Sequence, residues 1–335
     1  MNAFVLQQRA EQAAFFNRFD SDSLLPDATY RTKPEHFGLN LNPAYSGALV
    51  EHFAFPNNPI QWHQHKNHAL SSQICCVNFL GPLMHRPDLL ALVMQSALGS
   101  DKPQMVPVSK DRHGTDIFVD FEWIGAADHL GEWPAAGRAT RGANATSADA
   151  AVRFRAADGT LTTALIEWKY TESYAQPIDP RGNQTRIGRY ADKTFFPHGP
   201  LRPDLGLHVQ DLFWEPFYQL ARQQMLAWRM ERAAEDGADR VMVMHISAAG
   251  NTALHKVTAP RLQSLGADAF DVFHSLLVEP SRFHATSIEQ AFLPTIRSAL
   301  AADAQDPWAA YLVERYAFLG KSAMKPSHAT TSGMF

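Results

Sequence analysis

The sequence predicts a mixed α/β protein whose core is built on one central sheet. Three observations predict this class: an alternating run at 116–124, two strand-like runs at 147–154 and 161–170 joined by an Asp-Gly turn, and a long amphipathic run at 209–234. A short apolar strand is expected after it at 241–246. In chain order the core therefore reads helix, three strands, long helix, strand, and further helices extend it at both ends.

The first part of the chain predicts helices that precede the sheet. Residues 3–19 are expected to form a helix, and a stretch rich in proline and asparagine follows without clear periodicity. Residues 69–98 also show helical spacing, and Ser71 or Ser72 can cap the start of that helix. Because proline interrupts helices, Pro82 and Pro87 predict a break into two helices.

The run at 116–124 alternates apolar and polar side chains, which predicts a strand with one polar face. Its apolar side chains are Ile117, Val119, Phe121 and Trp123, and its polar ones are Asp116, Asp120 and Glu122. A connection rich in glycine, alanine and threonine leads to the next strand, which carries Asp149. Since Asp158-Gly159 separates that strand from the following one, the sequence predicts a hairpin.

The second half of the chain predicts a loop, a strand and several helices. The stretch at 175–206 is polar and rich in proline, glycine and arginine, which fits a functional loop or insertion. Helices are expected after the last strand at 259–275, 286–302 and 306–319, and the polar tail from Lys321 is expected to be mobile. Four parts are predicted: an N-terminal extension packed on the core (1–64), the core (65–250), a C-terminal helical extension (251–320) and a flexible tail (321–335).

Composition limits the classes of function. The 335 residues carry a net charge of −4, so the chain as a whole lacks the basic character typical of nucleic-acid-binding proteins. One local basic cluster is a candidate for phosphate contact, although a solvated loop explains it equally well: Arg181, Arg186, Arg189 and Lys193. No membrane span or signal peptide is recognisable, and the adjacent Cys75 and Cys76 are expected to be buried free thiols of a cytoplasmic protein.

A carboxylate and an ammonium two residues apart mark the strand at 161–170. Alternation places Glu167 and Lys169 on one face of that strand, while the opposite face is apolar. A buried charge is unfavourable unless it is paired or bound to an ion, so Glu-x-Lys on a core strand indicates chemistry. From the alternation alone, a structural ion pair on a partly exposed sheet is an equally good interpretation.

The predicted hairpin would bring Asp149 close to Glu167 at one edge of the sheet. Two carboxylates form a partial shell for Mg²⁺, which prefers oxygen ligands and retains several waters. Glu122, on the polar face of the preceding strand, would complete the shell or hold a second ion. Lys169 beside such a site would position or deprotonate a water, or stabilise charge on a phosphoryl oxygen, which indicates metal-assisted phosphodiester hydrolysis.

These residues resemble the PD-(D/E)XK nuclease superfamily, and more narrowly a restriction-endonuclease-like family with an Ile-Glu-Trp-Lys-Tyr-Thr-Glu motif. The resemblance covers roughly residues 65–250. It rests on Asp149, on 165–172 and on two earlier segments, Ser71-Ser72-Gln73 and Asn78-Phe79-Leu80-Gly81-Pro82-Leu83. It implies a restriction-endonuclease-like αβββαβ core with a mixed central sheet flanked by helices.

The resemblance also implies roles for individual residues. Asp149 and Glu167 would bind Mg²⁺, with Mn²⁺ as a substitute, and Lys169 would be the catalytic lysine. Ala148 stands where the superfamily motif has a proline, a position that varies within it. Glu122 and either Gln223 or Gln224 match accessory polar positions only loosely.

The sequence therefore predicts a cytoplasmic, Mg²⁺-dependent nuclease acting on DNA, in a restriction or defence role. Asp149, Glu167, Lys169 and Glu122 would form its site, while Gln223 and the Arg181 to Lys193 loop would contact the nucleic acid. A symmetric homodimer would be the simplest way to cut two strands. The alternative is a non-catalytic nucleic-acid-binding subunit of the same fold, and a third interpretation is a hydrolase with zinc at His63, His65 and His68.

Overall fold

The central sheet has six strands and mixed direction. The structure, a computed structural model, describes residues 2–322 except 27, 57, 136 and 144. The strand order is β10-β9-β8-β7-β3, and β6 also pairs with β7. The strands are β3 (Gln104–Val106), β6 (Val119–Trp123), β7 (Ala148–Arg155), β8 (Leu161–Lys169), β9 (Arg240–Ser247) and β10 (Phe283–Ser287). Pairs involving β7 are antiparallel, whereas β8, β9 and β10 run parallel to one another, so the predicted mixed α/β class is confirmed.

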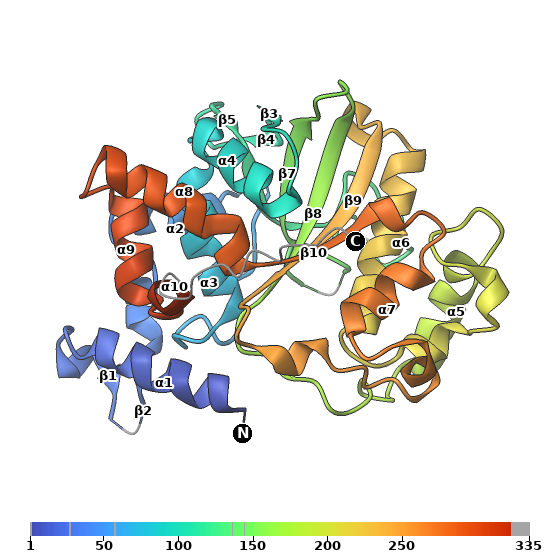
Figure 1. The fold of residues 1–335 in the computed structure, drawn as a ribbon, viewed down its shortest axis with the longest axis horizontal. Helices are drawn as coiled ribbons and strands as arrows, with labels where there is room; N and C mark the ends of the chain where they lie inside the picture. Colours follow the sequence, from blue (N-terminus) through green and yellow to red (C-terminus); the bar gives the residue numbers. More distant parts are fainter. Residues whose placement is uncertain (1, 27, 57, 136, 144, 323–335) are drawn as a thin grey trace, which may run out of the picture.

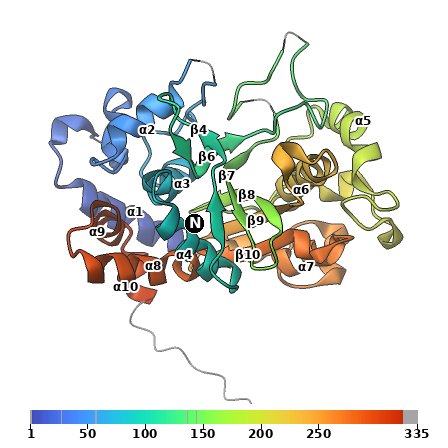
Figure 2. The same cartoon turned by 90° about the horizontal axis from the view of Figure 1, so that it is seen from above.

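Helices cover both faces of this sheet. Their bounds are α1 (Ala3–Phe16), α2 (Ser46–Phe53), α3 (Ser72–Leu80), α4 (Pro87–Leu98), α5 (Asn183–Thr194), α6 (Phe217–Arg232), α7 (Ala269–Leu276), α8 (Ile288–Ala302), α9 (Pro307–Arg315) and α10 (Phe318–Ser322). Figures 1 and 2 show α5, α6 and α7 on one side of the sheet and the other helices on the opposite side. This is a restriction-endonuclease-like arrangement. None of the described helices is long and apolar enough to cross a membrane.

The β7–β8 hairpin forms as the Asp-Gly pair predicts. Its register runs from Arg155 opposite Leu161 to Ala150 opposite Ile166. Gly159 in the connecting turn has φ +85°, a backbone conformation that favours glycine. The apolar face of β8 packs on the helices, since the Trp168 ring lies 5.3 Å from that of Phe79 on α3.

The helical region at 69–98 is divided where the prolines predict. Ser71 caps α3, because its side chain accepts a hydrogen bond from the backbone N–H of Ile74. Pro82 lies in a short 3-10 turn after α3, and Pro87 occupies the first turn of α4. Both cysteines lie buried in α3 as free thiols.

Two smaller pairs of strands lie outside the central sheet: β1 (Leu24–Leu25) with β2 (Ala28–Thr32), and β4 (Ser109–Lys110) with β5 (Asp116–Ile117). The run expected as one strand at 116–124 is therefore split into β5 and β6. Of its polar side chains, Asp116 on β5 is exposed, whereas Asp120 and Glu122 on β6 are buried. Asp120 is accommodated there by a contact of 2.6 Å with Arg141 and one of 3.0 Å with His52.

Three expectations for the second half are wrong in detail. The stretch expected as a loop at 175–206 contains α5, whose only buried side chains are Tyr190 and Thr194. The long helix begins at Phe217, after a 3-10 turn at Val209–Leu212. The expected C-terminal helical extension (251–320) contains α7, α8 and α9, but also β10, an edge strand parallel to β9. The tail from Lys321 is described only as far as the end of α10, so its expected mobility falls on residues outside the described ones.

The N-terminal residues are joined to the C-terminal helices by a buried arginine. Arg315 of α9 is 1% exposed, and its guanidinium donates to Gln12 Oε1 at 3.2 Å, Tyr311 Oη at 2.6 Å and Asn40 Oδ1 at 3.1 Å. These bonds connect α1, the segment before α2, and α9. The N-terminal segment is therefore held against the C-terminal helices.

Candidate active site

The four predicted site residues lie at one end of the central sheet. Glu122 is near the end of β6, Asp149 is at the start of β7, and Glu167 and Lys169 are at the end of β8. Since β7 runs antiparallel to both neighbours, its first residues meet the last residues of β6 and β8. The hairpin geometry thus brings these side chains to the same end of the sheet.

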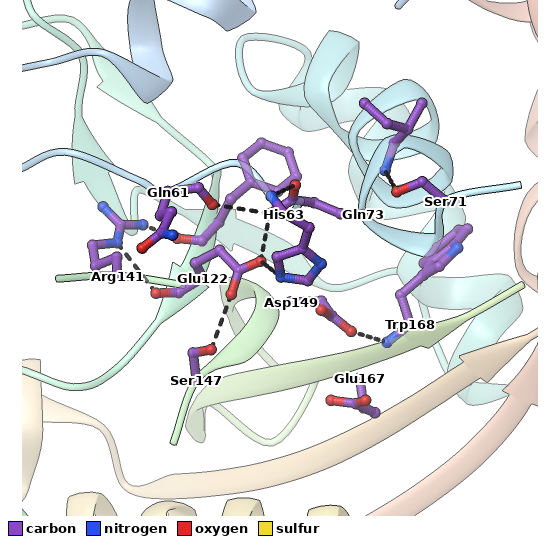
Figure 3. Close-up of polar contacts among 12 residues, drawn as sticks. Gln61, His63, Ser71, Gln73, Glu122, Arg141, Ser147, Asp149, Glu167 and Trp168 are labelled. Carbon is purple, nitrogen blue, oxygen red and sulfur yellow. Dashed lines mark hydrogen bonds and ion pairs between the residues drawn. The ribbon is translucent and has the colours of Figure 1, made fainter. Parts of the chain in front are cut away.

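Strand β7 separates from β8 at Asp149. The last backbone pair between the two strands is Ala150 with Ile166, whereas β8 continues to pair with β9 as far as Lys169 and Ser247. Beyond that last pair, the carboxylate of Asp149 accepts the backbone N–H of Trp168 at 2.7 Å (Figure 3). A side chain thus replaces a strand partner where the sheet opens.

Glu167 is buried and is held by two side chains. It forms an ion pair with Lys169, and its Oε2 accepts a hydrogen bond from the Gln223 amide on α6. The same amide donates to the backbone oxygen of Ser147 at 3.1 Å. Gln223 therefore links α6 to both strands of the site.

Burial makes the charged forms of these carboxyls unfavourable. It raises the pKa of Asp149 to about 6, against the attraction of Lys169. Burial and repulsion by Asp149 raise the pKa of Glu167 to about 8. Burial alone would lower the pKa of Lys169, but the attraction of Glu167 outweighs it, and the pKa lies well above its usual range. Lys169 is therefore an ammonium between two acids.

Glu122 forms a separate hydrogen-bonded group with residues from three segments. Its Oε1 accepts from Gln73 Nε2 at 2.8 Å and lies 3.2 Å from His63 Nε2, and its Oε2 accepts from Ser147 Oγ at 2.9 Å. The hydrogen bond with Glu122 raises the pKa of His63. Figure 3 shows His63, Gln73 and Glu122 facing one another, with Glu167 apart from them. Glu122 also has φ +48°, an uncommon conformation for a non-glycine residue.

A pocket of about 380 Å³ opens beside Asp149 and Lys169. Besides these two, its polar and charged lining consists of Arg9, Arg31, His63, His65, His68, Ser71, Ser72, Gln73, Thr171 and Glu172. The pocket therefore lies between the N-terminal residues, the start of α3 and the open end of the sheet. A ligand in it would reach Asp149 and Lys169 directly.

The donor set fits a hard divalent cation through two carboxylates. Asp149 and Glu167 supply oxygen ligands, and their raised pKa values indicate that neighbouring positive charge would favour the ionised forms. Among the described residues, however, no three His, Cys, Asp or Glu side chains are grouped as a metal site. Glu122 is not grouped with these two carboxylates, and its oxygens accept from Gln73 and Ser147. The predicted zinc histidines, His63, His65 and His68, line one pocket, but among the described residues they are not grouped as a metal site either.

Of the predicted nucleic-acid contacts, the basic residues between 181 and 193 lie outside this pocket, whereas Gln223 contacts the site itself. Arg181 is exposed and pairs with Asp179, with a contact of 2.8 Å from Nε, and Lys193 pairs with Asp192 at 3.1 Å. Arg186 donates to the backbone oxygen of Arg181 at 3.0 Å, and Arg189 lies on α5. Gln223 is fully buried and contacts Glu167 and Ser147. None of these five residues lines the pocket beside Asp149.

Several residues near the site have roles that sequence reasoning missed. Gln73, Ser147 and His63 hold Glu122, although Ser71-Ser72-Gln73 was recognised as a motif without a role. His245 of β9 pairs in register with Glu167, is completely buried and has neither ring nitrogen bonded to a described residue. His245 lies in an apolar, strand-like run of the sequence, and nothing in that run indicates that it lies next to Glu167.

The fold and the site define a mixed α/β protein with restriction-endonuclease-like architecture and an acidic, lysine-containing site at the open end of its sheet. A family model described as Restriction Endonuclease associating with ARP matches residues 9–317. The chain belongs to that family. No curated protein and no solved structure matches the chain.

Proposed function

We propose that this protein is a Mg²⁺-dependent nuclease of the PD-(D/E)XK type that hydrolyses phosphodiester bonds in DNA. The observation that carries the proposal is the position of Asp149, Glu167 and Lys169 at the end of the sheet where β7 leaves β8. Family membership supports a nuclease with a restriction or defence role. A cytoplasmic location and a symmetric dimer that cuts both strands belong to the same proposal.

Asp149 and Glu167 are the groups that would hold the cation. A bound Mg²⁺ would neutralise charge on the phosphate and activate a water. Glu167 is positioned for this by Gln223, and Asp149 by the N–H of Trp168. Glu122 would be a further ligand, since its oxygens keep free lone pairs while they accept from Gln73 and Ser147.

Lys169 would act as an ammonium. Its raised pKa argues against a role as a general base, since a base must be unprotonated before it accepts a proton. Its N–H groups would orient the attacking water and stabilise the charge that develops on a phosphoryl oxygen. The ion pair with Glu167 keeps the ammonium at the site.

A non-catalytic nucleic-acid-binding subunit is the second candidate. The family description includes association with ARP, which fits a chain that works with a partner. The presence of both carboxylates and the lysine favours the enzyme, because a subunit released from catalysis has no need to bury the charges of Glu167 and Lys169.

A cleavage assay tests the proposal. Wild-type protein would be incubated with plasmid, linear duplex and single-stranded DNA in Mg²⁺, Mn²⁺ or EDTA, and compared with Lys169→Ala. Lys110→Ala is the matched control, because Lys110 is exposed and pairs with Asp116 on β5. We expect cleavage that requires metal, is lost in Lys169→Ala and persists in Lys110→Ala. Binding of DNA without cleavage under every condition would favour the non-catalytic subunit.

A further inference from the structure

Two arginines of the N-terminal segment line the pocket beside the candidate active site, and neither forms an ion pair with an acidic side chain among the described residues. Arg9 lies on α1 and Arg31 on β2, and both contribute to the pocket that contains Asp149 and Lys169. The Nε of each is buried and lacks a hydrogen-bond partner among the described residues. Both side chains are otherwise partly exposed, so their terminal N–H groups can reach the cavity, where a guanidinium is suited to bind an anionic ligand.

The backbone fixes these arginines in place. Arg31 is bridged to His68, and the backbone N–H of Ala69 donates to the oxygen of Tyr30 at 3.0 Å. The guanidinium of Arg9 lies 5.4 Å from the centre of the Tyr30 ring, and that ring lies 5.2 Å from His68. The two arginines are therefore held before a ligand arrives, which lowers the entropy cost of binding.

The electrostatic environment favours an anion at this place. Burial, reinforced by Arg31, Arg9 and His65, lowers the pKa of His68 to about 4. Of the two pocket carboxylates, Glu172 already accepts from Ser72 and, at 2.9 Å, from the backbone N–H of Tyr170. Positive charge is thus in excess around His68, on which both arginines act.

The start of α3 adds further donors to the same wall. Ser71, Ser72 and Gln73 form the cap and first turn of this nine-residue helix, and all three line the pocket. The backbone N–H groups at a helix N-terminus attract anions. Together with the unpaired arginines, this makes a wall that is suited to phosphate.

We propose that Arg9, Arg31 and the N-terminus of α3 bind a backbone phosphate of the nucleic-acid substrate, next to the phosphate that is cut. This inference rests on the proposed nuclease function and assigns the substrate contact to the N-terminal segment instead of α5. A pocket of about 380 Å³ suits a small-ligand site, so one nucleotide unit of a strand would enter it, and not a whole duplex.

The test measures binding in the absence of catalysis. Fluorescence anisotropy of a labelled single-stranded DNA oligonucleotide in EDTA would compare wild type with Arg9→Gln and Arg31→Gln. Arg112→Gln is the matched control, because Arg112 is exposed and paired with Glu51. We expect each pocket variant to weaken binding at least about tenfold, and the control to leave it unchanged. The slope of log affinity against log salt should fall by about 0.7 for each arginine removed.

Two further measurements distinguish loss of the phosphate contact from misfolding and from binding of a free anion. Arg31→Lys retains the charge and should keep part of the affinity, with circular dichroism confirming that each variant is folded. Inorganic phosphate should compete with the oligonucleotide only at much higher concentration than a dinucleotide, because a strand offers more contacts. Equal competition by both would mean that a free anion is the ligand and would overturn the assignment to a strand.

The outcomes separate this inference from the proposed function. If wild type cuts DNA and Lys169→Ala does not, while both pocket variants bind and cut normally, the phosphate site is wrong and the nuclease stands. If the pocket variants lose binding but no condition gives cleavage, the phosphate site stands and the nuclease is wrong. Unchanged salt dependence in both pocket variants also overturns the phosphate site.

Discussion

The carboxylate of Asp149 accepts the backbone N–H of Trp168 at 2.7 Å, at the point where β7 has stopped pairing with β8. This contact gives Asp149 two functions. It satisfies a backbone donor of β8 that β7 no longer pairs, and it directs one carboxylate towards the open end of the sheet. The two functions can be separated by mutation, because an amide also accepts a hydrogen bond but carries no charge.

We expect Asp149→Asn to remain folded and to lose metal-dependent cleavage at least about a hundredfold, since metal ligands need the charged carboxylate. Asp149→Ala also loses the acceptor for Trp168, and should be less stable than Asp149→Asn by about 1–2 kcal/mol. Chemical denaturation and a cleavage assay measure the two effects. Equal stability of the two variants would show that the Trp168 contact contributes little.

The raised pKa of Glu167 predicts that the metal-free protein loses stability as the pH rises. The folded state holds the Glu167 proton up to a pH of about 8, whereas an unfolded glutamate releases it near its ordinary value of 4.5. The contribution to stability is therefore complete below about 4.5 and is lost as the pH rises through about 8. Its slope is at most about 1.4 kcal/mol per pH unit.

Thermal melting in EDTA across this range would check the prediction. Asp149 titrates in the same direction, so the informative quantity is the difference between wild type and Glu167→Gln, which has no proton to lose. We expect a flatter pH dependence in Glu167→Gln, and also in wild type with saturating Mg²⁺. Parallel curves for wild type and variant in EDTA would contradict the assignment.

The β7–β8 hairpin and the site at its open end could be predicted because the residues that specify them lie close together in the sequence. Asp158-Gly159 and the flanking alternation specify the β7–β8 register, and this register alone brings Asp149 to the level of Glu167. The Glu-x-Lys motif on β8 then identifies Lys169 as the third member of the site. No long-range contact has to be inferred to bring these residues together.

The elements that the sequence missed depend on distant contacts. Helix α5 has few apolar side chains and contacts α6, which is remote in sequence. Strand β10 is short and partly exposed, and it forms by pairing in parallel with β9. The phosphate-binding wall combines Arg9, Arg31 and the start of α3, and none of these segments has a local pattern that points to the others.

Glu122 is predicted to stabilise the fold through its three hydrogen-bonding partners. Replacing it with Gln removes the charge and places an amide N–H₂ against donors, so Glu122→Gln should lower the free energy of unfolding by about 1–3 kcal/mol. Glu51→Gln is the control, because Glu51 is exposed on α2 and forms a surface pair with Arg112. Urea denaturation of both variants measures the difference, and similar losses in the two would refute a special role for Glu122.

A comparison of Gln223 with Gln224 distinguishes an effect on the candidate site from an effect on helix packing, because both are buried neighbours on α6. Only the Gln223 amide donates to Glu167, whereas Gln224 lies beside another pocket, near Trp228 and Glu231. Gln223→Leu should leave Glu167 without a donor that fixes its carboxylate, and so reduce the cleavage rate at least about tenfold and weaken Mn²⁺ binding. Gln223→Leu also removes the hydrogen bonds to Glu167 and Ser147, so it should lower the free energy of unfolding by about 1–3 kcal/mol more than Gln224→Leu. Calorimetric titration of Mn²⁺ and single-turnover cleavage measure these effects, and we expect a defect in Gln223→Leu that Gln224→Leu lacks. Equal defects in both variants would mean that α6 affects the site only through packing.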